Sequence, residues 1–280
     1  MLKIRSILKH EQNRQWIILG VLYVAMVLWW FFIQKKGIID TWENFLFGAG
    51  IGLFTLIGGI IGLVKASNWG FFKSAIGKSV TFLSAGLITW ALGTLIFAYY
   101  NFFLDIAVPY PSIADLAYIF SWPLWTIGIL QLWPALGIKY QLKKASGKLF
   151  LFLIPLIFIS LSYYLLFIIA RGGVWDFTGG FAKLFFDLAY PVGDIVILTT
   201  IALVYSLSVG YLGGIFKFPV LVILFGFILN FASDFSFSFT TTKESFFVGS
   251  WVDLLFLSTM FVISFGISIF DPNILSEKNV

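Results

Sequence analysis

The sequence contains no cysteine, a single histidine and few charged residues. Without cysteine, disulfides, thiolate nucleophiles and iron–sulfur or cysteine-ligated zinc sites are excluded. The histidine, His10, lies among charged residues ahead of the first apolar segment, where a solvated side chain is expected rather than a metal ligand. Phosphate-loop, dinucleotide, Ser/His and HExxH motifs are also missing. We therefore expect no cofactor and no enzymatic activity, with catalysis by aspartates alone as the open alternative.

What the chain has instead is apolar sequence. Hydrophobic residues make up 60% of it and charged residues 11%, against about 45–50% and about 25% in soluble domains. A helix needs roughly 20 apolar residues to cross about 30 Å of hydrocarbon. Eight segments meet this requirement: 16–33, 45–64, 79–102, 112–133, 149–170, 183–207, 218–239 and 248–270. The composition predicts an all-α, multi-pass membrane protein in contact with the lipid bilayer.

The chain divides into three parts on this interpretation. Residues 1–15 form a basic leader, residues 16–270 the eight-helix transmembrane domain, and residues 271–280 a short tail. The leader resembles the start of a signal peptide, but the segment behind it has full spanning length and no small-x-small cleavage site. We expect it to remain as an uncleaved first span.

The distribution of basic residues predicts the orientation. With eight spans both termini lie on one side, and that side holds thirteen basic residues: Lys3, Arg5, Lys9, Arg14, Lys65, Lys73, Lys78, Lys139, Lys143, Lys144, Lys148, Lys217 and Lys278. The other side holds five: Lys35, Lys36, Arg171, Lys183 and Lys243. Cytoplasmic loops carry the excess of Lys and Arg. We expect both termini in the cytoplasm and the protein in the plasma membrane, and we attribute the net charge of +5 to this bias rather than to nucleic-acid binding.

The spans form four approximate hairpin repeats, in each of which the returning helix begins near an acid. These acids are Asp40 and Glu43, Asp115, Asp187 and Asp253. Two of the starts share the pattern Ser-x-x-Asp-Leu, at Ser112 and at Ser250. A serine N-cap with an acid three residues later is a capping box, worth about 0.5–2 kcal/mol. Capping is the favoured explanation for Asp115 and Asp253, and ligand binding near a cavity mouth is the alternative.

Capping does not explain Asp194 or Asp234, which lie inside the sixth and seventh spans. A carboxyl group at such depth costs a few kcal/mol unless it faces protein, water or a partner, so it indicates a functional site. Each belongs to a polar stripe on one helix face. The stripes are Asp187, Tyr190 and Asp194, and Asn230, Ser233, Asp234 and Ser238. The alternative is a protonated structural acid that is hydrogen-bonded across helices.

Prolines and small residues accompany these acids. Pro191 and Gly193 are predicted to interrupt the sixth span as a hinge, and Pro123 to do the same in the fourth. Trp90, Trp122 and Trp125 are candidates for the cavity wall, although packing is the commoner role of aromatic residues. Two glycine pairs in the second span, 48/52 and 58/62, predict close helix contact.

Four stretches resemble the multispan N-terminal sensor region of bacterial GGDEF/EAL cyclic-di-GMP proteins and of some sensor histidine kinases. They are PSIADLAYIFSWPLWTIGI (111–129), DLAYPVGDIVILTTIAL (187–203), FILNFASDFSF (227–237) and SWVDLLFLSTMF (250–261). The Pro-Ser-x-Ala-Asp-x-x-Tyr and Tyr-Pro-x-x-Asp motifs match in full, whereas Ser233 and Phe237 replace the family's Ala and Tyr. The resemblance covers about residues 79–270. In that family a catalytic domain follows the last helix, whereas ten residues follow it here, so a separate signalling partner is expected.

Three hypotheses follow. The first is a stand-alone membrane sensor whose outward-facing acidic cavity, lined by Asp187, Asp194, Asn230 and Asp234 with Tyr190, Asp115 and Asp253, binds a cation, a proton or a small polar molecule. The second is a cation- or proton-coupled secondary transporter that uses Asp194 as its coupling carboxylate. The third is an assembly protein that binds another membrane subunit. The identity of any bound metal stays open.

Overall fold

The computed structural model describes residues 14–104, 106, 108–136, 145–174, 180–208 and 216–270, and all of its regular structure is helical. The helices are α2 (Gln15–Lys36), α3 (Trp42–Asn68), α4 (Ala75–Phe103), α5 (Ile113–Leu130), α7 (Ala145–Ser162), the π-helix η4 (Tyr163–Ala170), α8 (Gly180–Ser208), α9 (Lys217–Thr242) and α10 (Trp251–Ser268), with short 3₁₀ turns η2 (Phe71–Lys73) and η3 (Pro134–Leu136). Eight segments among these are long and apolar enough to cross a membrane, with α7 and η4 forming one of them. The predicted all-α fold is confirmed for the described residues, and the eight apolar helices are consistent with the predicted multi-pass membrane protein. The tail 271–280, His10, Lys139, Lys143 and Lys144 lie outside the described residues.

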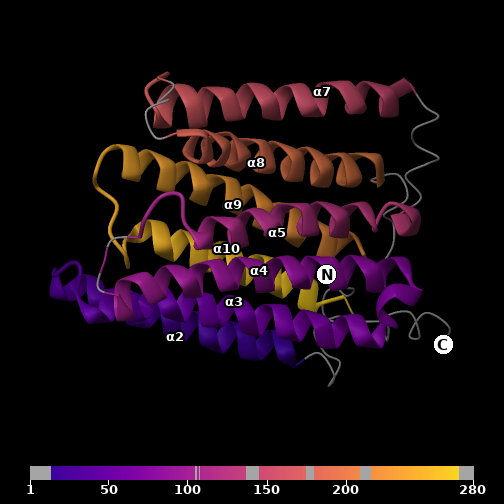
Figure 1. The fold of residues 1–280 in the computed structure, drawn as a ribbon. Coiled ribbons are helices and arrows are strands. Elements are labelled where there is room, and N and C mark those ends of the chain that lie inside the picture. The colour runs from indigo at the N-terminus through magenta and orange to yellow at the C-terminus, as the bar shows by residue number, and fades with distance from the viewer. Residues whose placement is uncertain are drawn as a thin grey trace.

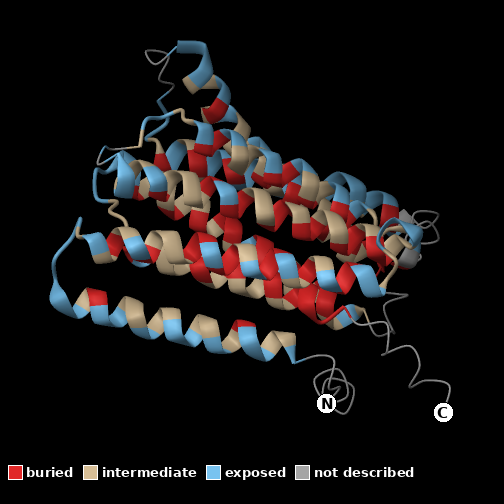
Figure 2. Ribbon diagram, turned by 60° about the horizontal axis from the view of Figure 1, so that its bottom comes forward, coloured by how far each residue is buried: buried red, intermediate tan, exposed pale blue. Residues whose placement is uncertain are grey.

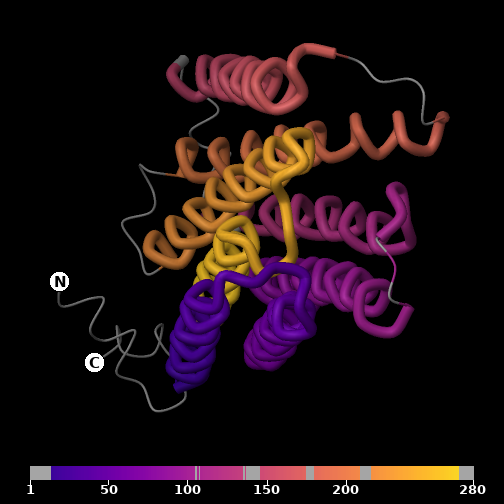
Figure 3. The backbone as a smooth tube through the Cα atoms, turned by 90° about the vertical axis from the view of Figure 1, so that its left-hand side faces the viewer, coloured from indigo at the N-terminus to yellow at the C-terminus, as the bar shows by residue number. Residues whose placement is uncertain are grey.

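The helices lie side by side in one bundle, with α7 at one edge and α2 and α3 at the opposite edge (Figures 1 and 3). α10 packs against α2, α3, α4 and α9 and so lies near the centre. α5 packs between α4 and α8, and α7 packs on α8. This arrangement brings the four aspartate-bearing helices α5, α8, α9 and α10 around the same part of the bundle.

The central helix α10 is more buried than α2 and the α7–η4 segment at the edges of the bundle (Figure 2). Half of the most apolar 18-residue window of α10 is buried, 50%, against 11% in both α2 and the α7–η4 segment. Side chains that face outward from edge helices meet hydrocarbon in a membrane, so apolar residues such as Val24 and Phe152 are at no disadvantage there. The core is formed mainly by α3, α4, α9 and α10, with buried residues of α5 and α8 completing it.

Glycines let α3 approach its neighbours closely, as the sequence predicts. A Cβ at Gly58 would overlap Ser264 of α10, and one at Gly62 would overlap Ser84 of α4. A Cβ at Gly52 would lie 3.0 Å from the side chain of Leu95 on α4. Small residues at such positions allow van der Waals contact between helix backbones, which is the main source of helix association in lipid.

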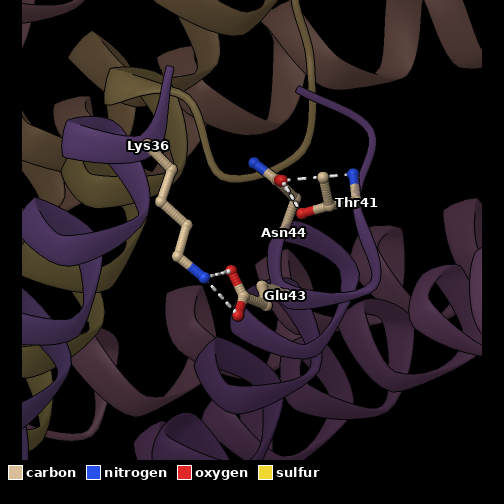
Figure 4. Close-up of polar contacts among 4 residues, drawn as sticks. All are labelled: Lys36, Thr41, Glu43 and Asn44. Carbon is tan, nitrogen blue, oxygen red and sulfur yellow. Dashed lines mark hydrogen bonds and ion pairs between the residues drawn. The ribbon is translucent and has the colours of Figure 1, made fainter. Parts of the chain in front are cut away.

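The turn between α2 and α3 is fixed by polar contacts (Figure 4). Thr41 caps α3 in a capping box with Asn44, whose Oδ1 accepts from the backbone N–H of Thr41 at 3.2 Å. Lys36 pairs with Glu43 at 2.6 Å. Asn44 also donates to the carbonyl of Val248 at 3.0 Å. The start of α3 is thereby tied to the loop that precedes α10.

The interruptions predicted at proline are absent. α8 is helical through Pro191 and Gly193, and α5 is helical through Pro123. A proline removes one backbone hydrogen bond, but both helices continue through it without a break. The irregular segment is η4, whose eight residues continue α7 as a π-helix and pack on α9. The sequence pattern gave no sign of it.

We predict that Gly86→Ala destabilises the protein by about 1–3 kcal/mol, because the added methyl group would overlap the indole of Trp125 and overpack the core. Trp125 has no room to move, since it is fully buried and donates to the carbonyl of Leu83 at 3.2 Å. Gly20→Ala is the matched control, because nothing lies within 4 Å of its added Cβ. Thermal unfolding in detergent measures both variants. Equal stability of the two would contradict the packing described for α4 and α5.

Candidate functional site

One cavity of about 660 Å³ lies at the end of the bundle that carries the α2–α3, α4–α5 and α9–α10 connections, on the left in Figure 1. α3, α4, α5, α8, α9 and α10 all contribute to its walls. Every residue predicted to bind a ligand lines it: Asp115, Asp187, Tyr190, Asp194, Asn230, Asp234 and Asp253. Side chains that are up to 138 positions apart in the sequence, from 115 to 253, therefore converge on one space.

The deepest polar group of the cavity consists of Asp194 on α8 and Asn230 and Asp234 on α9. Asp194 and Asn230 are 2% and 3% exposed. The amide of Asn230 donates to Oδ2 of Asp234 at 2.7 Å, and the Asp194 carboxyl interacts with both of these side chains. Oδ2 of Asp194 and Oδ1 of Asn230 are buried without a hydrogen-bond donor among the described residues. Buried acceptors of this kind call for a donor, and neighbouring carboxylates repel each other unless a cation or proton lies between them.

Asp115 links two helices half-way along the cavity. Its Oδ2 accepts from the backbone N–H of Ser112 at 2.6 Å and from the Ser112 hydroxyl at 2.9 Å. Its Oδ1 accepts from the hydroxyl of Tyr190 on α8 at 2.6 Å. The predicted capping box is confirmed, but capping is not the whole explanation for Asp115, because the same carboxylate also joins α5 to α8.

Asp253 departs from the predicted capping box. Ser250 occupies the N-cap position, but its hydroxyl makes no capping bond and has no partner among the described residues. Asp253 accepts instead from the N–H of Gly249 at 2.6 Å. Gly249 has φ +84°, and its carbonyl accepts from Trp30 and Gln34 of α2, so the loop turns one residue earlier than in the Ser112 motif. The two Ser-x-x-Asp-Leu segments therefore differ in structure.

The sequence predicted an acidic cavity, but basic side chains lie at its mouth beside Asp187. Asp187 lies 3.2 Å from the guanidinium of Arg171 and 4.0 Å from the ammonium of Lys183, and it accepts from the hydroxyl of Tyr110 at 2.9 Å. Burial and the adjacent Asp187 raise the pKa of Tyr110. The sequence could have predicted the contact between Lys183 and Asp187, because residues four positions apart lie on the same face of a helix.

Aromatic rings form much of the remaining wall. The ring of Trp90 lies 5.6 Å from that of Tyr118 and 5.8 Å from that of Phe256, and all three residues line the cavity. Trp122 lines it as well, whereas Trp125 is buried behind it against Phe227. Two of the three candidate tryptophans therefore belong to the wall. Sequence reasoning missed Tyr118 and Phe256, although each lies three residues after a predicted acid, Asp115 or Asp253, on the same helix face.

The three residues predicted to form hinges line two different spaces. Pro191 lines the cavity, whereas Gly193 and Pro123 line a separate space between α5 and α8. A Cβ at Gly193 would overlap the indole of Trp122, so glycine is needed there for close packing. Among the described residues, no group of three or more His, Cys, Asp or Glu side chains is placed to hold a metal ion.

Comparison of the chain with family models, with curated proteins and with solved structures finds no match in any of the three. The assignment of a role to the cavity therefore depends on its own geometry and chemistry.

We predict that Tyr190→Phe lowers the free energy of unfolding by about 1–3 kcal/mol, because it leaves Oδ1 of Asp115 without its donor inside the bundle. Tyr163→Phe serves as the control, since Tyr163 is 57% exposed on η4. Thermal unfolding in the same detergent compares the two. A Tyr190→Phe protein as stable as the Tyr163→Phe protein would show that the Asp115 bond contributes nothing.

Proposed function

We propose that this protein is a membrane sensor module whose outward-facing cavity binds a small organic cation, with a primary amine as the ligand chemistry. The observation that carries the proposal is the pair of buried acceptors without donors, Oδ2 of Asp194 and Oδ1 of Asn230, beside the carboxyl group of Asp234. An ammonium group supplies three N–H donors and a positive charge. It therefore satisfies the acceptors and removes the repulsion between the two carboxylates.

The walls suit the rest of such a ligand. Cations bind favourably over the faces of Trp and Tyr rings, and Trp90, Tyr118, Trp122 and Tyr190 surround the approach to the deep acids. A volume of about 660 Å³ lies within the range of about 300–1,000 Å³ that is usual for sites that bind small molecules. Arg171 and Lys183 at the mouth pair with Asp187, so the charge that an entering cation meets becomes more negative with depth.

The proposal includes an orientation. The excess of basic residues in the loops at the opposite end of the bundle supports cytoplasmic termini in a plasma membrane, with the cavity open to the outside. The four hairpin repeats are part of the same proposal, with an acid near the start of each returning helix. The resemblance to bacterial sensor regions supports the transmission of ligand binding through helix movement to a separate signalling partner.

A sensor is favoured over a transporter by the packing of the other half of the bundle. There, Ile201, Val204 and Leu207 of α8 and Val220 and Ile223 of α9 are fully buried, and none of them lines the cavity. These side chains of α8 and α9 are apolar and packed together in the core. A transporter that uses Asp194 as its coupling carboxylate needs this packing to open, whereas a sensor does not.

Thermal unfolding of the purified protein with a panel of primary amines from ethylamine to benzylamine tests ligand binding. An amine at about 100 times its dissociation constant adds about 2.7 kcal/mol to the stability of the native state. We expect at least one amine to stabilise the wild type, and we expect Asp194→Asn and Asp234→Asn to abolish this effect by removing the charge beside the ammonium group.

Asp40→Asn is the control, because Asp40 is an exposed acid in the α2–α3 turn and does not line the cavity. It should respond to the amine as the wild type does. If no amine stabilises the wild type, or if both Asn variants still respond, the proposed site is wrong.

Flux into reconstituted vesicles separates the sensor from the transporter. We expect a radiolabelled amine that stabilises the protein to enter protein-containing vesicles no faster than it enters protein-free vesicles, with or without a pH gradient. Uptake that depends on the protein and is lost in Asp194→Asn would replace the sensor proposal with the transporter.

A further inference from the structure

A second cavity, a groove of about 630 Å³, lies between α5 and α8, two helices that pack side by side (Figure 3). Among the described residues that line it, none carries a charged side chain, and Thr126 supplies the one hydroxyl group. It differs in this from the acidic cavity, to which five aspartates contribute: Asp115, Asp187, Asp194, Asp234 and Asp253. Two neighbouring spaces in this protein thus have opposite chemistry.

The groove follows the outward face of α8. Phe181, Leu184, Leu188, Val192 and Val196 line it at intervals of three or four residues, which places them in one stripe. Val192 is 55% exposed, and in a multi-pass membrane protein such a side chain faces hydrocarbon. From position 181 to position 196 the helix rises about 22 Å, most of the roughly 30 Å of a bilayer core.

A wall one side chain thick separates the groove from the acidic cavity. Trp122 and Leu184 line both spaces. The ring of Trp122 also lies edge-on to the ring of Tyr190 at 4.9 Å, and Tyr190 donates to Asp115 inside the cavity. Gly193 leaves the room that Trp122 occupies. The apolar groove therefore adjoins the cavity of the proposed cation site, with the side chains of Trp122 and Leu184 between the two spaces.

We propose that the ligand is an amphiphilic amine, whose ammonium group binds at Asp194 and Asp234 and whose alkyl chain lies in the groove between α5 and α8. This inference rests on the proposed function and names its ligand class more closely. The chain crosses the wall between Trp122 and Leu184, whose side chains must turn to admit it. A ligand of this kind enters from the outer leaflet of the bilayer and extends only its charged end into the protein.

The test measures binding of ethylamine, hexylamine and decylamine to the full chain in lipid nanodiscs by calorimetry. Each methylene group removed from water tightens binding by roughly fourfold. Partition of the amine into the bilayer also increases with each methylene group, so chain length alone does not show where the alkyl chain lies. Val192→Trp is the informative variant, because it fills the groove and leaves the cavity unchanged. Val24→Trp is the matched control, since Val24 on α2 is also 55% exposed and lies outside the groove.

We expect apparent affinity to rise with chain length equally in the wild type and Val24→Trp. Val192→Trp should lose the part of this gain that the groove supplies, so that it binds decylamine more weakly than Val24→Trp does and ethylamine equally well. If Val192→Trp retains the same gain with chain length as Val24→Trp, the chain lies elsewhere and the inference is overturned, while ethylamine binding sustains the cation site. If the wild type binds ethylamine as tightly as decylamine, the inference is also overturned. Failure of the wild type to bind any of the three amines overturns the proposed function and the inference with it.

Discussion

The structure depends on the cost of placing carboxyl groups inside a membrane-spanning bundle. Asp194 and Asp234 lie among helices that bury mainly apolar side chains, and Asn230 is their neighbour. In the part of the chain that the structure describes, the basic residues that line the cavity are Arg171 and Lys183, at its mouth. Such groups persist only where protein, water or a ligand satisfies them. The close packing of α3, α4 and α10 through glycine and serine forms a rigid frame against which α5, α8 and α9 hold the acids in place.

Polar contacts in the cavity change in character with depth. At the mouth, Asp187 is paired with Arg171 and Lys183, and half-way down Asp115 is satisfied by Ser112 and Tyr190. Among the described residues that line the cavity, the buried acceptors without a donor belong to Asp194 and Asn230, at the bottom. The acids that join helices thus lie nearer the surface, and the acids to which the proposed function assigns ligand binding lie at the end of the path.

The sequence predicted the helices well because a spanning helix needs little beyond length and apolar composition. It predicted the acids of the cavity because a carboxyl group within an apolar segment has few structural explanations. It failed where the outcome depends on neighbours in space. Ser250 and Ser112 begin the same motif, yet only Ser112 forms a capping box, since Gly249 and α2 fix the other loop. The pairing of Arg171 with Asp187, the role of Gly193 beside Trp122 and the π-helix at Tyr163–Ala170 likewise depend on packing that local patterns do not record.

The most direct test of the central claim is chemical modification of the buried acids with a hydrophobic carbodiimide, followed by mass spectrometry of the peptides. The account predicts that Asp194 or Asp234 is modified to the N-acylurea in the ligand-free protein. A free primary amine converts an activated carboxyl to an amide, so total modification is counted as N-acylurea plus amide. A saturating primary amine is expected to lower this total at Asp194 or Asp234, while the total at the exposed Asp40 stays the same. Modification of Asp194 and Asp234 that is unchanged by any amine would contradict a cation site at the bottom of the cavity.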